Sequence, residues 1–256
     1  MGGRKKHPSP VRGDRPKKAP QKKPIRLELS GAQARELSKR LWPLFWMHGA
    51  LCLYAVPAAI LRITGTEAVP AVWNAALGSV LLWASRVCPR FGRAAALFFC
   101  CAGIFLLELL FSGMTVTALV LACAGLAASL AGTFLELDAL REAARGEELS
   151  EKWRRLRFWA VAANACGAGL TILYPVVNAL LLHTDLDPAA PLDMAVGVQR
   201  LGAYLGVGLL SFLCAAATVV TEVLFLVYLV RTVRLLKRFA EQCEKREEKK
   251  KRRENA

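Results

Sequence analysis

The sequence has none of the short motifs that mark the common hydrolase and nucleotide-binding sites. It contains no Gly-x-Ser-x-Gly nucleophile elbow, no HExxH zinc helix and no Walker A phosphate loop. Histidine is scarce, and the eight cysteines include no CxxC pair. We therefore predict no metal site, no cofactor and no disulfide framework, and no residue pattern supports an enzyme.

Charged residues are almost absent from six long stretches of the chain. Each stretch approaches the length of about 20 residues that a membrane-spanning helix requires, and the mean hydropathy of the whole chain is +0.34. A soluble core is not divided in this way. The sequence thus predicts an all-α, polytopic transmembrane bundle, in which the second span is the shortest. The predicted spans are residues 41–61, 69–85, 94–113, 115–137, 158–183 and 201–230.

Acidic residues are few beside basic ones, 20 against 35, which gives a formal net charge of +15. If the N-terminus is cytoplasmic, every Lys and Arg except Arg62 and Arg200 falls on the cytoplasmic side, as the positive-inside rule requires. Orientation accounts for the charge, so we expect anionic lipid headgroups and no nucleic acid as partners. We predict a plasma or bacterial inner membrane protein with both termini in the cytoplasm. Five tryptophans fall near the inner interface as an aromatic belt: Trp42, Trp46, Trp83, Trp153 and Trp159.

Three segments outside the spans are predicted to be cytoplasmic. Residues 1–29 form a basic tail whose first part is rich in Lys, Pro and Gly, a composition typical of disorder. Ser30 and Gln33 then form a capping box that starts a helix, which we place on the membrane surface. Residues 138–157 predict a helical hairpin that a protein partner could bind, with Gly146 as the stop and Ser150 as the next N-cap.

The third cytoplasmic segment is the basic helical tail at residues 231–256. Its apolar residues recur at helical spacing among Lys and Arg, which is typical of a helix lying on anionic lipid. These apolar residues are Val233, Leu236, Phe239 and Ala240.

Small residues follow one face of the fourth span. They recur at steps of three and four, which predicts a close contact between two helices without any chemistry. The stripe consists of Ala118, Ala122, Gly125, Ser129 and Gly132.

Polar residues at membrane depth are the candidate site. Glu222 in span six is the leading candidate, because an intramembrane carboxylate must be neutral, paired or solvated. Asn164 in span five and His48 in span one lie at a similar depth, so the three predict one pocket open to the cytoplasm. Thr218 and Thr171 belong to the polar stripes of spans six and five.

Glu108 in span three is a second intramembrane carboxylate. We place it toward the outer leaflet, where headgroup water can reach it.

Two functions follow from these features. The polar pocket favours transport or binding of a small solute or ion, with Glu222 exchanging a proton or holding a cation. The small-residue faces, the hairpin and the basic tails favour a non-catalytic membrane scaffold or assembly protein. A water-filled cavity would favour the first function, and dry packing would favour the second.

Overall fold

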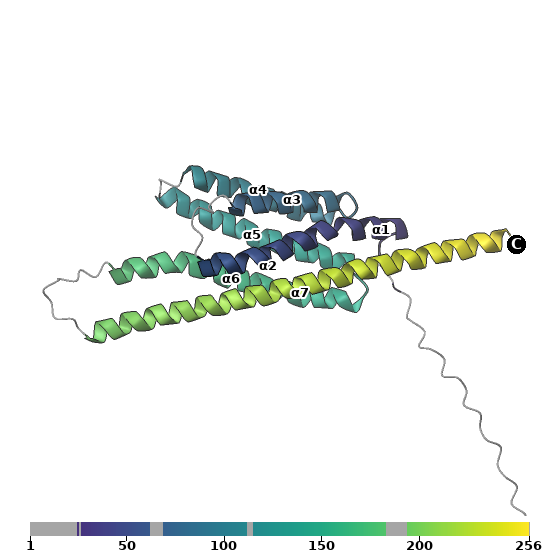
Figure 1. The fold of residues 1–256 in the computed structure, drawn as a ribbon. Helices are drawn as coiled ribbons and strands as arrows, with labels where there is room; N and C mark the ends of the chain where they lie inside the picture. Colours follow the sequence, from purple (N-terminus) through teal and green to yellow (C-terminus); the bar gives the residue numbers. More distant parts are fainter. Residues whose placement is uncertain (1–24, 26, 62–68, 112–114, 183–193, 256) are drawn as a thin grey trace, which may run out of the picture.

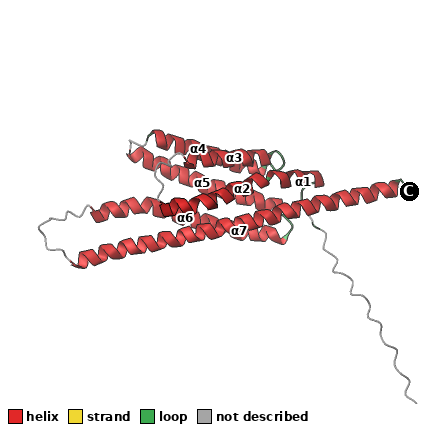
Figure 2. Ribbon diagram, in the orientation of Figure 1, coloured by secondary structure: helices red, strands yellow, loops and turns green. Residues whose placement is uncertain are grey.

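The structure is a computed structural model that describes residues 25, 27–61, 69–111, 115–182 and 194–255, without the side chains of 54–61, 115, 171–182, 194–201, 203, 204 and 207. The described chain is helical, and Figure 2 shows no strand in it. The helices are α1 (Gly31–Arg40), α2 (Trp42–Leu61), α3 (Val69–Ser85), α4 (Arg90–Leu110), α5 (Thr115–Ala143), α6 (Glu148–Leu182) and α7 (Met194–Glu254).

The helices pack mostly against their neighbours in sequence. α4 packs against both α3 and α5, α5 also packs against α6, and α6 packs against α7. In Figure 1 α7 runs along the whole molecule, while α3 and α4 lie on the opposite side of α5. α7 has 61 residues and is about 90 Å long at 1.5 Å per residue, so it is far longer than a bilayer is thick.

Three helices of the described chain are long and apolar enough to cross a membrane: Arg90–Leu110, Val116–Ala143 and Gly208–Glu254. α3 is apolar but has 17 residues, as predicted for the shortest span. The exposed surface of these helices is rich in large apolar side chains, including Leu110, Val116 and Phe212. Such a surface suits a lipid environment, because exposure of this much apolar area to water is unfavourable.

The turn between α5 and α6 forms one end of the bundle, which we call the hairpin end. α5 continues beyond the predicted fourth span to Ala143, and Gly146 has a φ of 92°, a left-handed conformation that favours glycine. The prediction of Gly146 as a stop is confirmed. The prediction of Ser150 as an N-cap is wrong, because α6 already begins at Glu148, and its acidic first turn suits the helix dipole.

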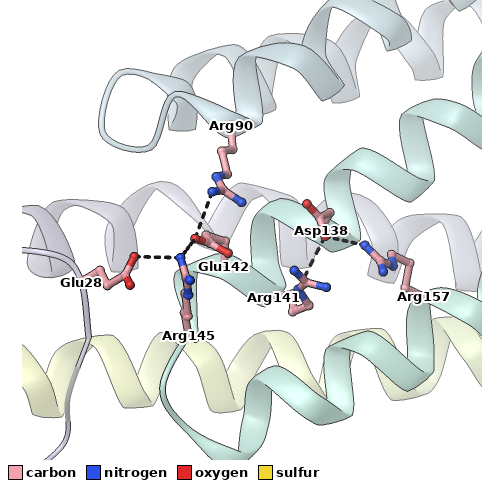
Figure 3. A network of polar contacts seen from close by, with 7 residues as sticks. All are labelled: Glu28, Arg90, Asp138, Arg141, Glu142, Arg145 and Arg157. Atoms are coloured by element: carbon pink, nitrogen blue, oxygen red, sulfur yellow. Dashed lines mark hydrogen bonds and ion pairs between the residues drawn. The ribbon is translucent and has the colours of Figure 1, made fainter.

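Ion pairs at the hairpin end join α4, α5, α6, the turn between α5 and α6, and the segment before α1 (Figure 3). Glu142 on α5 accepts from Arg90 of α4 at 3.1 Å and from Arg145 of the turn at 2.9 Å. Arg145 also reaches Glu28, at 3.2 Å, in the segment before α1. Asp138 pairs with Arg157 of α6, so the two arms of the hairpin are linked directly. These contacts fix the hairpin against the N-terminal segment and α4.

The small-residue face of α5 packs closely against α4, as predicted. A Cβ atom on Gly132 would lie 3.1 Å from the Phe98 ring, and one on Gly125 would lie 3.2 Å from the Phe105 ring. The Cys101 thiol donates to the Gly125 carbonyl at 3.3 Å. The stripe therefore lets two aromatic rings of α4 approach the α5 backbone.

The N-terminal helix was predicted to lie on the membrane surface, but its apolar side packs on α7. The Ser30–Gln33 capping box is present as predicted. Ala34 and Leu37 are fully buried, and a Cβ on Gly31 would lie 2.7 Å from the Cys243 Cβ. α7 therefore covers the apolar side of α1, and the position of α1 at the membrane surface stays a prediction.

The apolar stripe of the C-terminal helix is that partner. Val233, Leu236, Phe239 and Ala240 are all buried in the hydrophobic core, so the prediction that they lie on lipid is wrong. Ile25, Leu27 and Leu29 also pack against this core. The predicted disorder of residues 1–29 is thus wrong for these three residues, and residues 1–24 lie outside the described part of the chain.

Trp153 was assigned to an interfacial belt, yet it is a core residue. Its side chain is fully buried, and its indole N–H donates to the Thr232 hydroxyl at 2.9 Å. The ring meets Phe225 edge-to-face at 5.5 Å between centroids. A tryptophan near an interface can face either lipid or protein, and here the hairpin turns it inward.

Candidate functional site

Three ionisable side chains from three helices meet inside the bundle. His48 on α2 lies between Glu136 on α5 and Glu222 on α7, with Nε2 3.1 Å from Glu136 Oε1 and Nδ1 2.9 Å from Glu222 Oε2. The side chains of His48 and Glu136 are 9% and 2% exposed, and that of Glu222 is 20% exposed. We call these three residues the carboxylate–histidine cluster. Glu222 is its most accessible member.

Packing holds the imidazole between the two carboxylates. The His48 ring stacks on Phe225, one turn beyond Glu222 on α7, at 4.0 Å between centroids and 30° between planes. Phe225 is in turn held by Trp153 of α6. His48 is thereby oriented by stacking as well as by its two polar contacts, and α2, α5, α6 and α7 all contribute to its position.

The hydrogen bonds of the cluster set the smallest number of protons that it holds. Both nitrogens of His48 face carboxylate oxygens, so making both bonds requires two protons between them. An imidazolium between two carboxylates supplies two protons, and so does a neutral imidazole beside one protonated Glu. The cluster carries one net negative charge in either arrangement. Because a buried net charge is costly, binding one more proton or one monovalent cation would neutralise the cluster and stabilise it.

A cavity of about 330 Å³ adjoins the cluster. All three cluster residues line it, together with polar side chains from α3, α5, α6 and α7 and apolar ones such as Leu51 and Phe98. The polar side chains are Asn74, Ser129, Thr133, Asn164 and Thr218. The cavity therefore offers a small number of amide and hydroxyl groups beside two carboxylates, in a wall that is otherwise apolar.

The cavity lies on the side of the cluster away from the hairpin end. Its walls use residues that precede Glu136 on α5 and Glu222 on α7, such as Ser129 and Thr218. The residues that follow them toward the hairpin, including Leu140 and Leu229, belong to the buried hydrophobic core. Apolar packing therefore closes the cluster on the hairpin side, which is the side on which the sequence predicted the pocket to open.

The structure brings four of the six predicted site residues to one cavity. His48, Asn164, Thr218 and Glu222 all line it. Glu108 does not: it lies half-buried on α4 and is not among the lining residues. The side chain of Thr171 lies outside the described residues.

Sequence reasoning missed two members of the site. Glu136, near the end of the predicted fourth span, was not singled out, although it follows Gly132 by four residues and so continues the small-residue stripe on the inward face of α5. That register was the signal that could have revealed it. Asn74 on the short α3 is 7% exposed, and its amide donates to the Pro70 carbonyl at 2.7 Å. A lone Asn in an apolar span was the available signal for it.

Comparison with known proteins gives no match. No family model matches the chain, and no curated protein or solved structure is significantly similar to it. Function is therefore argued from the geometry of the site, because no relative supplies it.

Proposed function

We propose that the chain is a multi-pass membrane protein with six spans and both termini in the cytoplasm, in a plasma or bacterial inner membrane. Three described helices have the length and hydropathy of spans, and α3 is a shorter apolar helix. The distribution of Lys and Arg supports the orientation. The hairpin end, where Arg90, Arg145 and Arg157 gather, is then the cytoplasmic end.

Within this frame, the protein binds a small cation or a small hydrogen-bonding solute in the cavity, as a transporter or ligand-binding protein. The observation that carries the proposal is the buried imidazole between two carboxylates at the wall of a polar cavity. A packed scaffold has no need of such a cluster, since buried ionisable groups are expensive in a membrane.

The geometry assigns a role to each group. Glu222 faces the cavity and holds the cation or the additional proton, while Glu136 is buried and holds the imidazole through Nε2. Asn164 and Thr218 supply hydrogen bonds to a solute. The volume of about 330 Å³ lies at the lower end of the range for ligand pockets, so the ligand is small.

Thermal unfolding of the purified protein in detergent tests the proposal. We expect its Tm to rise with added Li⁺, Na⁺, K⁺ or guanidinium at constant ionic strength for the cation that fits, because a ligand bound only by the folded state stabilises it. Glu222→Gln removes this rise. Glu108→Gln is the matched control, since it neutralises an intramembrane glutamate that does not line the cavity.

A negative result with cations leads to a second measurement, of proton flux. If no cation raises the Tm of the wild type, proteoliposomes containing a pH-sensitive dye then measure proton flux. Proton flux lost in Glu222→Gln but kept in Glu108→Gln would support proton exchange at the cluster. The absence of both cation stabilisation and proton flux would contradict the proposal.

The scaffold function is the second candidate. It is favoured by the end of α7, which runs beyond the bundle in Figure 1 and has only exposed side chains at residues 244–255. This basic helix and the hairpin could bind an acidic protein. Loss of a partner on deletion of residues 244–256, with cation binding unchanged, would identify the scaffold function.

A further inference from the structure

A second cavity lies on the outside of the bundle, between α6 and α7. It is a groove of about 650 Å³, almost entirely apolar. Its walls include Leu156 and Cys166 of α6 and Ala217 and Leu224 of α7, and Ala163 is among the small residues that line it. None of these residues lines the cavity beside the carboxylate–histidine cluster. The groove is thus a separate site.

The groove changes character at the hairpin end. Lys152 and Arg155 of α6 and Tyr228 of α7 line it there. Lys152 also lines a neighbouring cleft of about 340 Å³ that contains three arginines of α7, Arg231, Arg234 and Arg238. Glu147 and Glu148 lie in the same cleft, so its basic residues outnumber its acidic ones. An apolar furrow therefore ends in a positively charged pocket.

We propose that this groove is a binding site for an anionic phospholipid of the cytoplasmic leaflet. One acyl chain lies in the furrow between α6 and α7, the phosphate contacts Lys152 and Arg155, and the headgroup faces the cleft of α7 arginines. The proposal rests on membrane insertion with the hairpin end in the cytoplasm, but not on solute binding in the other cavity.

Dimensions support a single acyl chain. From Leu213 to Tyr228 the α7 wall of the groove spans 15 steps, or about 22 Å at 1.5 Å per residue. One leaflet contributes about half of the 30 Å hydrocarbon core. The furrow is thus long enough for the chain of a lipid whose headgroup lies at the level of Lys152.

Charge supports an anionic headgroup. Lys152 faces Glu148 at 3.0 Å, and its hydrogen bond and charge lower the pKa of the Glu148 carboxyl. Arg155 is 76% exposed and only 3.5 Å from Glu151, a long contact that leaves its guanidinium available to a phosphate. Phosphate oxygens bind such groups through charge-assisted hydrogen bonds.

The charge also argues against a second copy of the chain as the occupant. A two-fold dimer across this groove would place two copies of Lys152, Arg155 and the α7 arginines at the same depth. Like charges that face one another across an interface disfavour association. A lipid brings the opposite charge.

Native mass spectrometry of the full chain tests the proposal, with equimolar phosphatidylglycerol and phosphatidylcholine added to the detergent. We expect retention of phosphatidylglycerol over phosphatidylcholine by about five-fold or more, since each basic residue near the headgroup favours anionic lipid by about that factor. The double variant Lys152→Gln/Arg155→Gln abolishes the preference. Arg154→Gln is the matched control, because Arg154 lies on the same turn of α6 but lines neither the groove nor the cleft.

A second pair of variants tests the acyl-chain position. Ala217→Trp fills the furrow and lowers the retention of both lipids, whereas Ala216→Trp, exposed but outside the groove, does not. Glu222→Gln leaves lipid retention unchanged, so failure of solute binding and failure of lipid binding are distinguishable. Equal retention of both lipids by the wild type would overturn the proposal. Two other results would also overturn it. One is an equal effect on lipid retention of the two variants in each matched pair, and the other is a lipid-free dimer that Ala217→Trp disrupts.

Discussion

At the residue scale, His48 is the central group of the site. It is the common partner of two carboxylates that are 2% and 20% exposed, so its ring keeps both of them from facing a low-dielectric interior alone. Phe225 stacks on the same ring, which links the cluster to the core at the hairpin end. The cluster is therefore the proposed binding centre and also a link between α2, α5, α7 and the core.

Substituting His48→Ala tests the structural part of this account. Removing one member of a buried charged network leaves an uncompensated charge, so we expect a loss of about 3–5 kcal/mol in the free energy of unfolding. Adding Glu136→Ala to His48→Ala should recover part of the loss, because the second substitution removes one unpaired carboxylate. Denaturant unfolding in mixed micelles, followed by tryptophan fluorescence, measures both. If His48→Ala is as stable as the wild type, the contacts of His48 with the two carboxylates do not contribute to the free energy of unfolding.

At the element scale, glycine positions decide how closely the helices approach. The stripe on α5 was predictable, because small residues at steps of three and four have few other uses in an apolar span. Its partner, α4, was not predictable from the pattern, since the stripe does not specify which helix supplies the side chains that pack on it, here Phe98 and Phe105. Helix bounds were predicted well for α3, whose ends match. α6 and α7 continue from their predicted spans into the charged hairpin and tail, which were also predicted to be helical, and α7 begins earlier than its predicted span.

Gly132→Val tests the α4–α5 contact. The added Cβ would lie 3.1 Å from the Phe98 ring, so the ring must move, and we expect a loss of about 1–3 kcal/mol in unfolding free energy. Gly103→Val on α4 is the control, because nothing lies within 4 Å of its position. Thermal unfolding of both variants in the same detergent gives the comparison. Equal Tm values for the two would contradict the close contact.

Gly31→Val tests the position of α1. The new Cβ would lie 2.7 Å from the Cys243 Cβ, so α1 must move away from α7. We expect faster labelling of the half-buried Cys243 by a thiol reagent, while Ala32→Val, on the exposed side of α1, leaves the rate unchanged. An unchanged rate in Gly31→Val would instead favour α1 lying apart from α7, on the membrane surface.

At the scale of the whole molecule, the site is closed on one side. The core that includes Phe225, Leu229 and Leu140 separates the carboxylate–histidine cluster from the hairpin end, and the cavity extends the other way. Matching depth along the chain predicted that His48, Asn164 and Glu222 meet, because depth follows from residue count within a helix. Depth alone could not decide which side of the pocket is closed, since that depends on how α1, α6 and the end of α7 pack together.

Accessibility of the cavity to water distinguishes a solute-binding site from a dry scaffold. In a chain whose eight native cysteines are replaced, single cysteines at Asn164 and Thr218 report on the cavity, and one at Ala160, buried on the same α6, reports on packed core. A membrane-impermeant thiol reagent is applied separately from each side of the membrane. We predict labelling of the cavity positions from the external side, none from the cytoplasmic side, and none at Ala160. Protection of the cavity positions from both sides in a folded protein would contradict the account and favour a dry scaffold.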